Sequence, residues 1–145
     1  MRLYLSLGSN MGERRENILR SVALLEEEFG VKALKLASIR ETEPWGMESA
    51  EKFLNSGAIF DIDIDPMEVL QICQSVERKL GREPHEAAFD NQGRRIYLPR
   101  VIDIDIILYG NYFVDNERLK IPHPLMWERD FVMDALREMD PQRFA

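Results

Sequence analysis

The order of strand and helix patterns constrains the fold of this chain more than any other sequence feature. Alternating or continuous apolar runs predict strands, and apolar residues at a spacing of three or four predict helices. The resulting elements are strands at residues 2–7, 31–42, 53–64 and 101–109, with helices at residues 14–29 and 66–80. This order is that of the split βαβ, or ferredoxin-like, α+β fold. It predicts an antiparallel sheet with helices packed on one face.

Residues at the expected helix ends fit this order. Gly30 follows the last apolar residue of the first helix and suits the left-handed position after a helix C-terminus. Asp65 can cap the second helix, and Pro66 fits its first position. A further helix near residues 129–138 forms a C-terminal extension. We expect residues 1–145 to form a single domain.

The composition excludes several classes of function. The chain has a net charge of -7 and a pI of about 4.9, which argues against nonspecific binding to nucleic acid. Its one cysteine, Cys73, cannot form an intramolecular disulfide, so nothing indicates secretion. The apolar run at residues 2–7 is too short for a signal peptide or a membrane span. We therefore expect a cytoplasmic protein without a nucleic-acid or membrane partner.

The chain contains two Asp-Ile-Asp stretches, at 61–65 and at 103–105. In a strand, both would place carboxylates on one face about 7 Å apart, a separation that suits two Mg²⁺ ions with phosphate oxygens between them. At 61–65, Asp65 already serves as a helix cap, and the stretch is typical of a solvated strand face. At 103–105 the flanking residues are strongly apolar, so the acids need a metal or an Arg partner unless their face is exposed.

Four short motifs occur in order along residues 5–131. They are Leu7-Gly8-Ser9-Asn10; Thr42, Pro44 and Gly46 followed by Phe53-Leu54-Asn55; Pro99-Arg100 followed by Asp103 and Asp105; and Ile121-Pro122-His123-Pro124 followed by Arg129 and Phe131. In this order and spacing they resemble the motifs of the 6-hydroxymethyl-7,8-dihydropterin pyrophosphokinase family of folate biosynthesis.

The resemblance implies both a fold and a reaction. The family has a ferredoxin-like fold, and its members transfer a diphosphate from ATP to the hydroxymethyl oxygen of the pterin, giving the pterin diphosphate and AMP. It therefore implies an ATP-dependent diphosphotransferase with two Mg²⁺ ions as cofactors. ATP and 6-hydroxymethyl-7,8-dihydropterin would be its partners, and we expect a monomer.

The resemblance also implies roles for individual residues. Asp103 and Asp105 would hold the metal ions, and Arg82 and Arg100 would assist catalysis through bidentate bonds to phosphate. The pterin-binding residues would be Gly8, Thr42, Trp45, Phe53, Asn55 and Phe131. The ATP-binding residues would be Gln74, Glu77, Arg100, Ile106, Arg118, Lys120, His123 and Arg129.

Several of these residues also have a purely structural interpretation. Phe53 and Phe131 could be ordinary core residues rather than rings that stack on a pterin. Gln74 and Glu77, three apart on one helical face, could form a solvated surface. Gly8 could simply permit a tight turn.

The chain departs from the family pattern at a few positions. Leu98 replaces a small residue, Pro84 stands where some members have Arg, and Trp45 replaces a smaller aliphatic residue. The departure at Leu98 leaves open a relative that binds ATP or pterin without turnover. A ferredoxin-like RNA-binding or regulatory domain is a further alternative, which the acidic composition and the paired acids disfavour.

Overall fold

The computed structural model describes residues 1–42, 52–81, 88–89, 95–96 and 101–144. Its elements are β1 (Arg2–Ser9), α1 (Arg14–Phe29), β2 (Lys35–Leu36), β3 (Arg40–Thr42), β4 (Phe53–Asp61), α2 (Pro66–Lys79), β5 (Ala88–Phe89), β6 (Arg95–Ile96), β7 (Asp103–Tyr109), β8 (Val114–Asp115), β9 (Lys120–Ile121), the 3₁₀ helix η1 (Met126–Glu128) and α3 (Asp130–Met139).

The main sheet has the strand order β2-β4-β1-β7, and β3 also pairs with β4. Every pairing in it is antiparallel. β1 lies between β4 and β7, so each neighbour in space is distant in sequence, as the split βαβ arrangement requires. The antiparallel α+β fold predicted from the sequence is confirmed.

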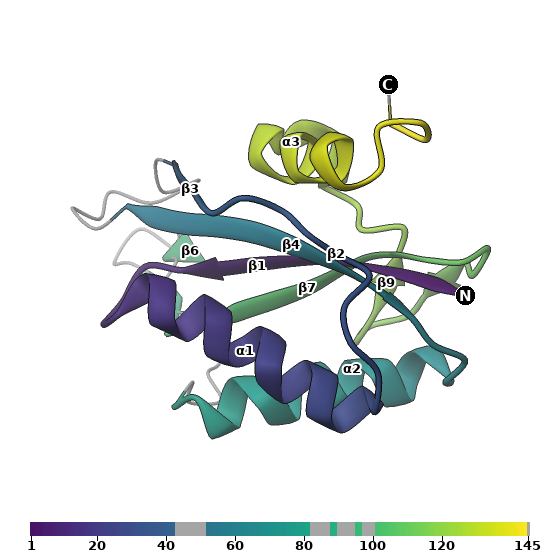
Figure 1. Ribbon diagram of the computed structural model, residues 1–145, viewed down its shortest axis with the longest axis horizontal. Helices are drawn as coiled ribbons and strands as arrows, with labels where there is room; N and C mark the ends of the chain where they lie inside the picture. Colours follow the sequence, from purple (N-terminus) through teal and green to yellow (C-terminus); the bar gives the residue numbers. More distant parts are fainter. Residues whose placement is uncertain (43–51, 82–87, 90–94, 97–100, 145) are drawn as a thin grey trace.

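The helices form two layers, one on each face of the sheet (Figure 1). α1 and α2 cover one face, where Leu3, Leu5 and Phe60 are fully buried. α3 covers the other face, where it packs on Tyr4 and Ile59. The prediction that the helices share one face is correct for α1 and α2 and wrong for α3. Residues 3–9 of β1 are all buried, so the strand is covered on both faces.

The expected strand at residues 31–42 is divided into β2 and β3. Leu36 pairs with Ala58, whereas Arg40 pairs with Asn55, so the register shifts by one residue between them. An extra residue in one of two paired strands is a β-bulge, and we call residues 37–39 the 37–39 bulge.

The expected strand at 53–64 ends at Asp61. The amino group of Met1 binds the Asp61 carboxylate at 2.9 Å and the Ile62 carbonyl at 2.8 Å, and the chain turns away there. The helix ends follow the sequence predictions: Gly30 has a φ of 73°, and Asp65 accepts a hydrogen bond from the N–H of Met67. Among the described residues, no helix is both long and apolar enough to cross a membrane.

Candidate active site

A row of directly paired residues crosses the sheet near the end of β1. Gly8 pairs with Asn55 of β4 on one side and with Asp103 of β7 on the other. Residues directly opposite one another in antiparallel strands project from the same face. Asp105 projects in the same direction as Asp103, and Ile107, two residues further on, packs in the core under α3. The prediction that the two Asp side chains share a face is confirmed, and Asn55 shares it with them.

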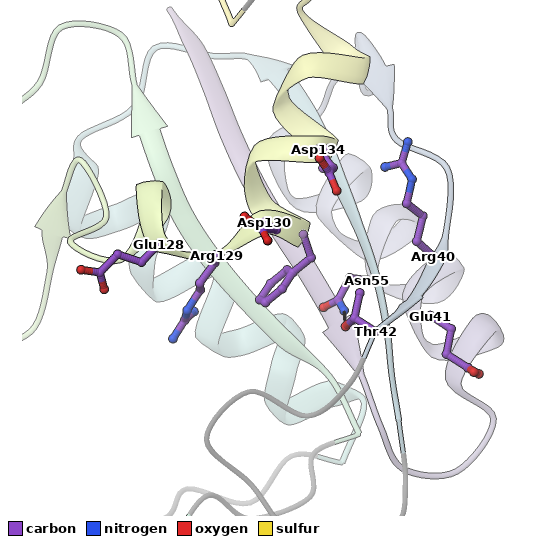
Figure 2. Close-up of a pocket in the computed structure, with 10 residues that line it drawn as sticks. Arg40, Glu41, Thr42, Asn55, Glu128, Arg129, Asp130 and Asp134 are labelled. Carbon is purple, nitrogen blue, oxygen red and sulfur yellow. Dashed lines mark hydrogen bonds between the residues drawn. The ribbon is translucent and has the colours of Figure 1, made fainter.

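A pocket of about 410 Å³ opens on this face between β3, β4, η1 and α3. Figure 2 shows Thr42 and Asn55 side by side on neighbouring strands, with Arg129 on the other side of the pocket. The lining residues are Arg40, Glu41, Thr42, Asn55, Glu128, Arg129, Asp130, Phe131, Asp134 and Ala135.

Thr42 and Asn55, both predicted to bind pterin, line one wall of the pocket, and Gly8 and Phe53 are paired with them in the sheet. Asn55 is 6% exposed, and its Nδ2 donates a hydrogen bond to Thr42 Oγ1. A Cβ on Gly8 would lie 3.0 Å from Asn55 Oδ1 and 3.6 Å from Phe53 Cδ1. Because Gly8 has no side chain, the Asn55 amide has room beside it. Gly8 therefore does more than permit a turn.

Arg129 connects the pocket to the acid pair. Its Nη1 lies 3.7 Å from Asp105 Oδ2, and its guanidinium carbon lies 6.0 Å from the centre of the Phe131 ring. The Arg129 side chain is 16% exposed, which strengthens its interaction with the carboxylate relative to a surface pair. An aromatic ring, a cation and a carboxylate thus follow one another along this side of the pocket.

The acid pair has the chemistry of a magnesium site. Asp103 and Asp105 are partly buried, so their oxygens can reach both protein and solvent ligands. Mg²⁺ prefers oxygen ligands and usually keeps several waters or phosphate oxygens beside one or two carboxylates. Within the described ranges, no cluster of three or more His, Cys, Asp or Glu residues forms a larger metal cage. The two carboxylates fit Mg²⁺ bound together with phosphate.

His123 is positioned at the same end of the sheet by its own backbone. Its N–H donates to the Ile107 carbonyl at 2.9 Å, and its Nδ1 accepts from the N–H of Leu125 at 3.2 Å. Burial and the Arg129 charge lower the pKa of His123, while Asp103 acts in the opposite direction. A neutral ring with Nδ1 as acceptor carries its proton on Nε2, which can donate to an anionic ligand.

α2 approaches β7 from the other layer. Glu77 is 7% exposed, and its Oε2 accepts from the backbone N–H of Ile104 at 2.9 Å, so the solvated interpretation of Glu77 is wrong. Gln74, one turn earlier, is partly buried, and the Ile106 side chain lies in the core between the sheet and α2. Burial, helped by the charges of Glu77 and Asp105, raises the pKa of the Cys73 thiol far above its usual range.

Other predicted residues lie away from the pocket walls. Arg118 is exposed between β8 and β9, and Lys120 in β9 pairs with Asp115 at 2.6 Å on the surface of the hairpin. The remaining residues singled out in the sequence lie outside the described residues: Trp45, Arg82 and Arg100, with Pro44, Gly46, Pro84, Leu98 and Pro99.

Several pocket residues were not predicted from the sequence. They are Arg40, Glu41, Glu128, Asp130, Asp134 and Ala135. Three of them could have been found from their spacing in the sequence. Arg40 precedes Thr42 by two residues in a strand and so shares its face, and Asp134 and Ala135 follow Phe131 at helical spacing.

Comparisons with known proteins show the family to which this chain belongs. Residues 4–141 match the model of the family described as 7,8-dihydro-6-hydroxymethylpterin-pyrophosphokinase (HPPK). The chain belongs to this family. A family member from Porphyromonas gingivalis, named 2-amino-4-hydroxy-6-hydroxymethyldihydropteridine pyrophosphokinase, is 41% identical over 140 residues, which cover 96% of this chain and 90% of the relative. A protein of the same name from Bacillus subtilis is 37% identical over 139 residues, which cover 96% of this chain and 78% of the relative.

A solved HPPK-DHPS structure, in complex with substrates, shares the fold. It aligns with a TM-score of 0.68 at 14% sequence identity, covering 97% of this chain and 40% of that one. At this identity the likeness supports the ferredoxin-like fold alone. The family assignment depends on the family model and on the relatives above.

Proposed function

We propose that this chain transfers the terminal diphosphate of ATP to 6-hydroxymethyl-7,8-dihydropterin, with the pterin diphosphate and AMP as products. The observation that carries the proposal is the pairing of Gly8 with both Asn55 and Asp103. Because these partners project from one face, an amide suited to a heterocycle and a carboxylate suited to a metal–phosphate complex flank Gly8 on the same side of the sheet. An acceptor and a diphosphate donor can therefore meet over β1.

The pocket wall supports pterin as the acceptor. An amide offers a donor and an acceptor side by side, which complements the mixed edge of a pterin, and Asn55 is held in place by Thr42. Phe131 and Phe53, from α3 and β4, provide aromatic faces for a flat ring. Burial of the ring between these elements would orient its hydroxymethyl group.

The acid pair supports a magnesium–ATP donor. Asp103 and Asp105 would hold two Mg²⁺ ions, which neutralise phosphate charge and align the reacting groups when bound. Arg129 and the Nε2 of His123 would bind phosphate oxygens directly, as would Arg82 and Arg100. In the reaction, the pterin hydroxymethyl group would lose its O–H proton to solvent as its oxygen bonds to the β-phosphorus. The bond from that phosphorus to the oxygen bridging to the α-phosphate breaks, and AMP leaves.

Residues 1–145 would act as one domain and as a monomer, in the cytoplasm, without a nucleic-acid or membrane partner. Gln74, Ile106, Arg118 and Lys120 would complete the nucleotide site, and Trp45 the pterin site. The expected mass in solution, by sedimentation equilibrium, is that of the 17.0 kDa chain.

Product analysis tests the proposed reaction. The purified chain is incubated with ATP and Mg²⁺, with and without 6-hydroxymethyl-7,8-dihydropterin, and nucleotides are separated by ion-exchange chromatography. AMP should appear only with the pterin and should disappear with EDTA. ADP in place of AMP would indicate transfer of a single phosphoryl group. Pterin binding without product would indicate a binding protein.

A further inference from the structure

Glu138 joins α3 to the 37–39 bulge. The N–H of Ser38 donates to both carboxylate oxygens of Glu138, at 3.1 and 2.9 Å, and the Ser38 hydroxyl donates to Oε2 at 2.7 Å. Arg40 Nη2 lies 2.6 Å from Oε1. One carboxylate of α3 thus binds the backbone and both polar side chains of a segment 98 to 100 residues away in the sequence.

The bulge makes the Ser38 N–H available to Glu138. Between Leu36 and Arg40 there is one residue more than in the facing part of β4. One residue of the bulge therefore has no place in the regular hydrogen-bond ladder with β4. Ala37 still donates to the Gly57 carbonyl at 2.9 Å, and the Ser56 hydroxyl donates to the Ala37 carbonyl at 2.7 Å. The bulge is therefore fixed to β4 on one side and to α3 on the other.

The same contacts connect two walls of the pocket. Phe131 and Glu138 are seven residues apart in α3, two turns, and so lie on one helical stripe. Phe131 lines the pocket, whereas Glu138 binds Arg40, which lines the wall opposite. Arg40 pairs directly with Asn55, and two residues later Thr42 pairs with Phe53.

We propose that Glu138 is a positioning residue for the pterin pocket. It holds β3 at a fixed distance from α3, and thereby sets the gap between Thr42 and Asn55 on one wall and Phe131 on the other. This inference rests on the proposed function, because the flat ligand that fills the gap is taken to be a pterin. Glu138 need not touch the ligand to act in this way.

The arrangement is stronger than an ordinary surface ion pair. The side chains of Glu138 and Arg40 are 31% and 42% exposed, and an isolated pair at this exposure contributes little. Here the hydroxyl and the N–H of Ser38 converge on the same carboxylate. The hydrogen bonds from Ser38, and then the charge of Arg40, lower the pKa of Glu138, so it stays ionised at neutral pH.

Glu138→Gln tests the proposal against a matched control, Glu28→Gln. Glu28 Oε1 lies 2.6 Å from Lys79 Nζ and joins α1 to α2 in the other layer, so it is an ion pair of equal length away from the pocket. Glu138→Gln should raise the Kd and KM for pterin about three- to tenfold and leave the Kd for Mg²⁺–ATP unchanged. Glu28→Gln should change neither. Equal losses for both ligands, or wild-type pterin affinity in Glu138→Gln, would overturn the inference.

Amide hydrogen exchange separates this inference from the proposed function. The Ser38 N–H should exchange slowly in the wild type and about tenfold or more faster in Glu138→Ala, since exchange follows local opening. If the wild type bound no pterin, the proposed function would fail. Fast wild-type exchange at Ser38 would instead show that Glu138 does not hold the bulge, whatever the ligand.

Discussion

Glu77 Oε2 accepts a hydrogen bond of 2.9 Å from the backbone N–H of Ile104. Ile104 lies between Asp103 and Asp105 in β7, the edge strand of the main sheet. A buried carboxylate from α2 therefore holds the backbone that carries the acid pair, from the layer opposite the pocket.

Replacing Glu77 should destabilise the fold in a graded way. Glu77→Ala removes the acceptor from a buried N–H, which costs about 1–3 kcal/mol. Glu77→Gln keeps an acceptor oxygen and should cost less. Urea unfolding measures both, with Gln71→Ala, an exposed residue of the same helix, as the control. Unfolding free energies equal to wild type in Glu77→Ala would show that the bond to Ile104 contributes nothing.

Glu77 also illustrates what the sequence could and could not predict. The spacing of Asp103 and Asp105 alone predicts that they share a face, because side-chain alternation is a local property. That Asn55 joins them depends on the register of β1 with both β4 and β7, which no local pattern encodes. The burial of Glu77 depends on how α2 packs on an edge strand, and so its helical spacing was compatible with a solvated face.

Gly8→Ala should impair pterin binding more than it impairs folding. The new Cβ would lie 3.0 Å from Asn55 Oδ1, so the amide must move by a few tenths of an ångström. Gly8 does not have a positive φ, so Ala introduces no backbone strain. We expect the Kd for pterin to rise about tenfold or more, with the loss measured by fluorescence titration.

Gly57→Ala provides the comparison for Gly8→Ala. Its Cβ would lie 2.8 Å from Met139 Cε and 3.0 Å from the Leu5 carbonyl, beneath α3, and Gly57 is not among the residues that line the pocket. Overpacking of this kind costs about 1–3 kcal/mol. Gly8→Ala should thus lower the affinity for pterin, whereas Gly57→Ala should lower the melting temperature. A lowered melting temperature with normal pterin affinity in Gly8→Ala would contradict a role for Gly8 in pterin binding.

His123 should make folding stability depend on pH in a defined direction. Its pKa is lowered in the folded state, so the unfolded chain takes up the proton first as the pH falls below about 6.5. Stability should therefore decrease as the pH falls from about 7 towards the lowered value, and this contribution should be absent in His123→Gln. Urea unfolding at several pH values measures the difference. A difference of the opposite sign between the wild type and His123→Gln would mean that Asp103 outweighs burial and Arg129.

Removing either acid of the pair should abolish metal-dependent nucleotide binding without unfolding the chain. Asp103→Asn and Asp105→Asn each remove one oxygen donor with a full charge, and an amide is a poorer ligand for Mg²⁺. Relief of the repulsion between the two acids should offset the loss of favourable contacts such as that of Arg129 with Asp105, so the unfolding free energy should stay within about 1 kcal/mol of wild type. Asp63→Asn is the control, because Asp63 is exposed beyond the end of β4. Calorimetric titration with ATP and Mg²⁺ should show binding only in the control and the wild type. Retained Mg²⁺-dependent binding in both variants of the pair would place the metal elsewhere.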